Sequence, residues 1–170
     1  MKKYLAEIQQ FYRDNADPAN VAKYARYFID GYDAYGVDSK LSEKQLSTWL
    51  SDWNSSLSWD QWLDLADLLM DSPKYEERMC GIGFIMHQRE RFTPDLADRV
   101  EVWYSKGWIR TWADVDVSAT QVLQPLLLDG HARLNQFKSW LTADSIWQRR
   151  AVPVTCIGLI GGQMINAGGI

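Results

Sequence analysis

The sequence predicts an all-α protein in which antiparallel helix pairs stack into an α-solenoid. Apolar residues recur at helical spacing along most of the 170 residues. No stretch of the sequence shows the sustained alternation of apolar and polar residues that is typical of strands. Capping residues and helix breakers recur at short intervals, which indicates many short helices rather than a few long ones.

Start and stop signals in the first half of the chain predict five helices. Asp17 followed by Pro18 is a favourable start for the second helix, and Gly36 is its predicted end. The pairs Ser42–Gln45 and Ser58–Gln61 have the spacing of capping boxes, which predicts the third and fourth helices. The expected ranges are about 2–14, 18–35, 43–54, 59–71 and 75–91.

The second half of the chain predicts four more helices. Thr93 and Pro94 predict the start of one helix, Thr111 caps the next, and Asp144 caps the last. The helix that Thr111 opens is expected to end at Asp129-Gly130. The other expected ranges are about 94–106 and 131–142.

The predicted helices form pairs with a repeat. Their first members begin near residues 2, 42, 75, 111 and 144, a spacing of roughly 35–40 residues that is close to the HEAT and armadillo periods. Each helix pair exposes an apolar face that its neighbour covers, so we expect one HEAT-like repeat domain over residues 1–170 with a concave surface. Residues 151–170 contain five glycines and no charged residue, which predicts an incomplete, truncated last repeat from about residue 151.

Composition limits the compartment and the partners. The net charge of −4 argues against a chain that is basic all over, but it permits the local basic face that DNA binding needs. Cys80 and Cys156 stand alone, which predicts free thiols in a reducing, cytoplasmic compartment. Because no His or Cys cluster has metal-ligand spacing, we expect no metal or other cofactor. We also expect no membrane partner, and the oligomeric state stays open.

The most informative segment is the run from Thr111 to Asp116. Trp112 and Asp116 are four residues apart, so they share one face of the predicted helix. At roughly 100° per residue, Asp116 borders an apolar stripe and Asp114 points away from it. A carboxylate in that place loses water at a cost in free energy, which calls for a functional reason. A Trp beside such an Asp can bind an electron-poor ring, and arginines on a nearby helix can bind a polyanion.

Five segments occur in the order found in a known family. They are Tyr24–Phe28, Tyr35–Val37, Tyr75–Arg78, Thr111–Asp116 and Trp147–Ala151. Together they resemble the AlkD-like, HEAT-repeat alkylpurine DNA glycosylases of the DNA alkylation repair family. The resemblance covers nearly all of residues 1–155, and the Trp-x-x-x-Asp and Trp-x-x-Arg elements carry most of it.

The resemblance implies a repair enzyme that removes cationic N3- or N7-alkylated purines from double-stranded DNA. Asp116 matches the family carboxylate that stabilises the oxocarbenium-like state and positions water. Trp112 matches an aromatic residue of the lesion cleft, and Tyr27 matches a second one. Arg150 matches the arginine that contacts the DNA backbone, and the adjacent Arg149 favours a phosphate contact at the same place.

An alternative is a catalytically inactive HEAT-like module that binds DNA shape or another protein. Gly36-Val37 is not followed by the Pro and Arg that the family usually carries, and the helices that supply a further cleft Trp are not found in this sequence. A glycosylase needs basic residues around the Trp112–Asp116 face. The candidates for that rim are Lys106, Arg110, Arg133, Lys138, Arg149 and Arg150.

Overall fold

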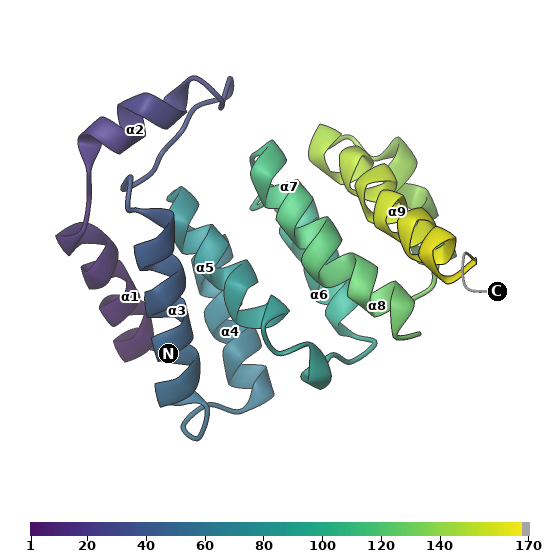
Figure 1. Ribbon diagram of the computed structural model, residues 1–170, viewed down its shortest axis with the longest axis horizontal. Helices are drawn as coiled ribbons and strands as arrows, with labels where there is room; N and C mark the ends of the chain where they lie inside the picture. The colour runs from purple at the N-terminus through teal and green to yellow at the C-terminus, as the bar shows by residue number, and fades with distance from the viewer. Residues whose placement is uncertain (168–170) are drawn as a thin grey trace. The chain divides into compact units, whose positions relative to one another are not determined.

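The computed structural model describes the backbone of residues 1–167 and the side chains of residues 1–157 and 159. Within these residues the chain forms nine α-helices and no strand, which confirms the predicted all-α class (Figure 1). The chain divides into two compact units, Met1–His87 and Gln88–Ile170. The predicted incomplete repeat from about residue 151 includes residues 168–170, which lie outside the described residues.

The first unit contains five helices around an aromatic core. α4 and α5 pack along each other, α3 packs against α5, and α1 packs against both α4 and α5. Trp49, Trp53 and Trp62 stack or tilt against one another and against Phe84, and all four are buried. The helices are α1 (Lys2–Asp14), α2 (Pro18–Ala25), α3 (Ser39–Trp53), α4 (Trp59–Met70) and α5 (Tyr75–Met86).

The second helix is shorter than predicted. α2 ends at Ala25 instead of continuing to Tyr35. The backbone N–H groups of Tyr35, Gly36 and Val37 donate to the buried carboxylate of Glu76 at 2.9, 2.6 and 3.3 Å. N–H groups that bind a side chain about 40 residues away cannot make the i→i−4 bonds of a helix, so residues 35–37 are not helical.

Two other helix boundaries in the first unit also differ from the prediction. α3 begins at Ser39, because the Asp38 carboxylate accepts from the N–H groups of Lys40 and Leu41, and Ser42 is therefore not its cap. α5 ends at Met86, and a short 3-10 turn follows in place of the helix predicted to residue 91. The capping box of Ser58 with Gln61 is confirmed at the start of α4.

The second unit contains α-helices, two 3-10 helices and one π turn within the described residues. A continuous helical stretch is formed by α7, the π turn η2 and α8. The π turn ends two residues before Pro125, which has no N–H and cannot make the regular i→i−4 bond. α9 packs against α7, η2, α8 and η3. The elements are η1 (Arg89–Arg91), α6 (Leu96–Ser105), α7 (Trp112–Ser118), η2 (Ala119–Leu123), α8 (Gln124–Leu128), η3 (Leu134–Thr142) and α9 (Ile146–Ala167).

Some boundaries in the second unit are confirmed and others are wrong. The cap at Thr111 and the end near Gly130, which has a φ of 76°, agree with the prediction. α6 begins at Leu96, two residues after the predicted start at Pro94. The helix predicted at 131–142 is a 3-10 helix. α9 is capped by Ser145, whose Oγ accepts from the N–H of Gln148, and not by Asp144.

Candidate functional site

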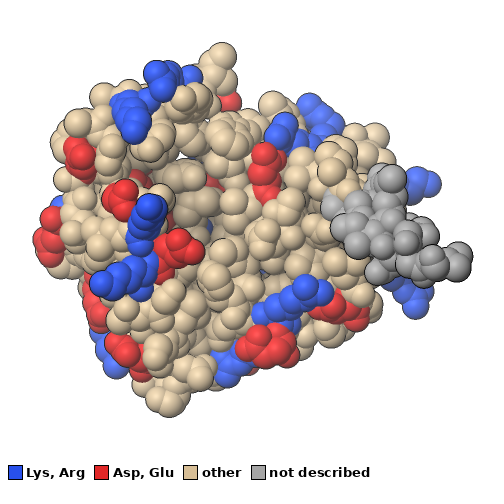
Figure 2. Space-filling model, in the orientation of Figure 1, with Lys and Arg blue, Asp and Glu red and all other residues tan. Residues whose placement is uncertain are grey.

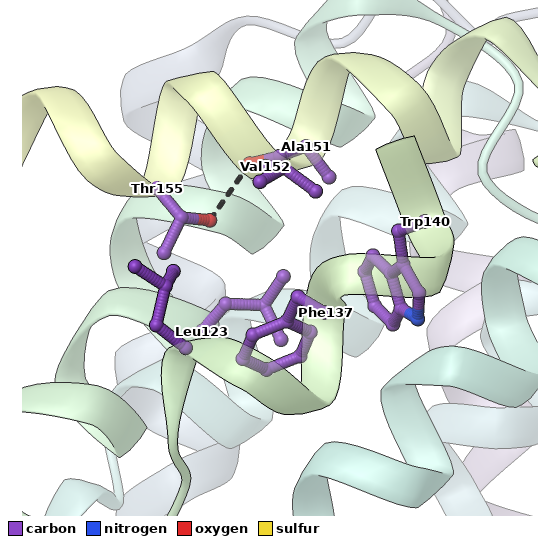
Figure 3. A pocket seen from close by; sticks show the side chains of 7 residues that line it. Leu123, Phe137, Trp140, Ala151, Val152 and Thr155 are labelled. Carbon is purple, nitrogen blue, oxygen red and sulfur yellow. Dashed lines mark hydrogen bonds between the residues drawn. The ribbon is translucent and has the colours of Figure 1, made fainter. Parts of the chain in front are cut away.

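The candidate site lies on α7 and α9, which contact each other within the second unit. An apolar seam holds α9 against η2 and η3. Figure 3 shows Leu123 and Phe137 facing α9, with Ala151 and Thr155 on the opposite side. Ala151 and Thr155 are almost fully buried, and the Thr155 hydroxyl donates to the carbonyl oxygen of Ala151 at 2.8 Å. The space between these side chains has no room for a water molecule, so it is a packing seam and not a ligand pocket. The seam fixes the first turns of α9 against η3 and against η2, which directly continues α7.

Asp114 is the carboxylate of α7 that loses its water. Its side chain is 0% exposed, and its Oδ2 accepts from the N–H groups of Arg110 and Thr111, both at 3.0 Å. The prediction that Asp114 points away from the apolar side was therefore wrong. As the third helical residue it forms a capping box with Thr111, which directs its side chain back toward the helix start. The Thr-x-x-Asp spacing was the sequence signal for this anchoring role.

Asp116 is half-exposed and bound to Arg150 of α9. Arg150 Nη2 donates to Asp116 Oδ1 at 2.9 Å and to Oδ2 at 3.1 Å, and Nε donates to Oδ1 at 3.1 Å. The Asp116 side chain is 35% exposed and the Arg150 side chain is 44% exposed. The structure thus joins two predicted site residues that are 34 positions apart in the sequence.

Trp112 completes the exposed side of α7. It is the first residue of the helix, lies one turn before Asp116, and is 42% exposed. A half-exposed indole ring beside an ion pair offers an apolar face that attracts cationic rings.

Arg149 lies next to Arg150 in the sequence but has other partners. Its Nη1 donates to the backbone carbonyl oxygens of Ala143 and Asp144 in the turn before α9. Arg149 therefore holds this turn, whereas Arg150 holds Asp116. The Arg110 side chain likewise donates to a backbone carbonyl, that of Gly107, at 3.1 Å.

Tyr27 belongs to the first unit. It lies in the irregular segment after α2 and is 53% exposed, and the guanidinium of Arg26 lies 4.8 Å from its ring centroid. Its predicted contact with the lesion stays a prediction.

The two cysteines differ in their surroundings. Cys80 is buried, and this burial raises its pKa strongly, so its thiol stays protonated at neutral pH. Cys156 is half-buried, and both cysteines are free. Within the described residues, no group of three or more His, Cys, Asp or Glu side chains could hold a metal ion. None of the described helices is long and apolar enough to span a membrane.

Charged side chains are mixed over the face of the molecule in Figure 2. In several places in this view Lys or Arg side chains lie beside Asp or Glu side chains, and wide areas carry no charged group. A polyanion that binds this protein is therefore expected to depend on local cations such as Arg150 more than on the net charge of −4.

Comparison with known families identifies the class of this protein. Residues 8–166 match the family of DNA alkylation repair enzymes. Since the match covers most of the 170 residues, the chain belongs to this family. No curated protein matches the chain at a significant level. The Trp112–Asp116 and Trp147–Ala151 segments, which carried the resemblance, both lie inside the matched range.

Proposed function

We propose that this protein is a DNA glycosylase that hydrolyses the N-glycosidic bond of N3- or N7-alkylated purines in double-stranded DNA. The supporting observation is the Asp116 carboxylate, half-exposed one turn after Trp112 and held in place by Arg150. The reaction needs no cofactor, and the proposed compartment is the cytoplasm, in keeping with the two free cysteines.

The substrate determines what the protein has to supply. An N3- or N7-alkylated purine already carries a positive charge, so its bond to the sugar breaks without a strong general acid. When that bond breaks, its electron pair moves onto the purine, which leaves as a neutral base. The sugar becomes an oxocarbenium-like cation. A carboxylate at the position of Asp116 stabilises this cation, and it can orient the water that adds to the sugar carbon and accept the proton that the water loses.

Arg150 has a second role in this proposal. Its bonds to Asp116 use Nε and Nη2, which leaves Nη1 for an oxygen of a backbone phosphate. A guanidinium that bridges a phosphate and Asp116 fixes the carboxylate relative to the DNA strand. Trp112 then offers its ring face to the cationic base or to the sugar.

The inactive binding module remains a second candidate, and one observation favours it. Asp116 is already neutralised by Arg150, and such half-exposed Arg–Asp pairs also occur as purely structural contacts. In that case the protein recognises DNA or another protein without cleaving a bond.

One experiment separates the two candidates. The purified protein is incubated with methylated duplex DNA, and released 7-methylguanine is measured beside the variant Asp116→Asn. Release by the wild type, and its loss in the variant, supports the glycosylase. If neither protein releases base but both bind the duplex, the binding module is correct.

A further inference from the structure

A row of outward-facing side chains leads up to Trp112. Residues 106–111 connect α6 to α7. From Trp108 to Trp112 the burial alternates: Ile109 and Thr111 are 1% and 8% exposed, while the residues between and beside them are exposed or half-exposed. The outward side chains form what we call the basic–aromatic row, which consists of Lys106, Trp108, Arg110 and Trp112.

The backbone of this row is fixed to the body of the second unit. The N–H groups of Trp108 and Ile109 donate to the carbonyl oxygen of Trp103 at 2.9 and 3.3 Å. The next two N–H groups, of Arg110 and Thr111, donate to the buried Asp114. Four consecutive backbone N–H groups, from Trp108 to Thr111, thus donate to acceptors within the second unit. The row is preorganised, so a partner that binds it loses little free energy in ordering the backbone.

The row alternates cations with aromatic rings. Lys106 Nζ lies 4.5 Å from the ring centroid of Trp108, and the Arg110 side chain is steadied by its bond to Gly107. Residues 102–113 contain no Asp or Glu, although acidic residues outnumber basic ones 22 to 18 in the whole chain. The backbone from Lys106 to Arg110 spans at most about 14 Å, so both cations reach one short stretch of a polyanion.

We propose that the basic–aromatic row binds the phosphate backbone of one DNA strand and guides it to Asp116. Lys106 and Arg110 pair with successive phosphates, and the rings of Trp108 and Trp112 pack against the sugars and exposed base edges between them. Alternation of cations and aromatic rings fits a nucleic acid strand, which alternates charged and flat groups. The inference rests on the proposed function only in taking DNA as the ligand. It assigns phosphate contacts to Lys106 and Arg110, two candidates for the basic rim, and adds Trp108 to the site as a binding residue.

The decisive test measures how binding depends on salt. A fluorescently labelled, undamaged duplex is titrated with protein at several salt concentrations, and fluorescence anisotropy gives the binding constant at each. Lys106→Gln should make the negative slope of log K against log salt less steep by about one, because one phosphate contact is lost. Lys44→Gln on α3 is the matched control, since Lys44 is an exposed lysine of the first unit, and its slope should equal that of the wild type. Equal slopes for all three proteins would overturn the proposal, as would a wild type that binds no duplex at low salt.

The aromatic part of the row needs a separate variant. Trp108→Leu keeps every charge but removes the ring under Lys106, so binding should weaken about 3-fold to 10-fold at every salt concentration with an unchanged slope. Thermal unfolding of the same preparation checks that the variant is folded. A folded Trp108→Leu protein that binds as tightly as the wild type would exclude the ring from the contact.

These outcomes are independent of base release. If the wild type releases 7-methylguanine but Lys106→Gln keeps the wild-type slope, the glycosylase proposal stands and the proposal for the basic–aromatic row fails. If the wild type releases no base but Lys106→Gln makes the slope less steep, the proposal for the basic–aromatic row stands and the glycosylase proposal fails.

Discussion

Asp114 and Asp116 lie two positions apart on α7 and do different work. Asp114 is fully buried, and two backbone N–H groups replace the water it has lost. Asp116 is half-exposed and shares its charge with one side chain, Arg150 of α9. Bonds to the backbone are made as the chain folds locally, so Asp114 supports structure. A bond between two half-exposed side chains can be remade with a ligand, so Asp116 is the carboxylate that is suited to chemistry.

The strongest test of this comparison is base release by Asp116→Asn. The amide keeps the shape of the side chain but removes the negative charge that, in the proposed mechanism, stabilises the developing sugar cation. We expect release of 7-methylguanine to fall by about 10²-fold to 10³-fold, the range seen when one preorganised electrostatic contact is lost. Single-turnover measurement on methylated duplex DNA gives this ratio. Base release that is unchanged in the variant would make Asp116 a structural residue.

The complementary test is the stability of Asp114→Ala. Removing this carboxylate leaves the N–H groups of Arg110 and Thr111 without their acceptor, which should lower the free energy of unfolding by about 2–3 kcal/mol. Asp116→Ala is the matched variant on the same helix and should cost less than about 1 kcal/mol, because its lost ion pair is half-exposed. Urea unfolding followed by circular dichroism compares them. The comparison fails if Asp116→Ala proves the more damaging substitution.

Arg150→Ala tests the role of the ion-pair partner of Asp116. We expect the salt dependence of duplex binding to fall by about one phosphate contact, together with a loss of base release smaller than that of Asp116→Asn. Arg150→Lys keeps the charge but cannot bridge Asp116 and a phosphate in the same way, so it should restore the salt slope better than the base release. Arg150→Lys with full base release would show that the bridging geometry is unnecessary.

The sequence predicted the helical class and most helix positions because apolar spacing and caps are local signals. Pairing of Asp116 with Arg150 was consistent with the motif, since both residues were expected near one site. The irregular course of residues 35–37 was missed because the buried Glu76, which binds their N–H groups, lies about 40 residues further along the chain. The burial of Asp114 was missed for another reason. Projection on a helical wheel treats all positions alike, whereas a capping box turns the third side chain back toward the helix start.

The smallest expected effect belongs to Asp129→Asn, which serves as a control for Asp116→Asn. Asp129 also forms a half-exposed pair with an arginine: Arg89 Nε and Nη2 donate to its two oxygens at 2.7 and 2.6 Å. The hydrogen bonds from Arg89 lower the pKa of Asp129 below its usual value. A lowered pKa means that the ionised carboxylate favours the folded state at neutral pH, and that this contribution disappears as the pH falls through the lowered pKa.

We therefore expect Asp129→Asn to lower the urea midpoint slightly at pH 7 and to match the wild type once the pH is below the lowered pKa of Asp129, because the wild-type carboxyl is then protonated too. Solvent screens this pair, so the shift at pH 7 should be near the limit of detection. Base release should be unchanged, because Asp129 lies at the end of α8 and not on the exposed side of α7. If Asp129→Asn reduced base release as strongly as Asp116→Asn, the effect of Asp116 would come from lost negative charge in general and not from its place beside Trp112 and Arg150.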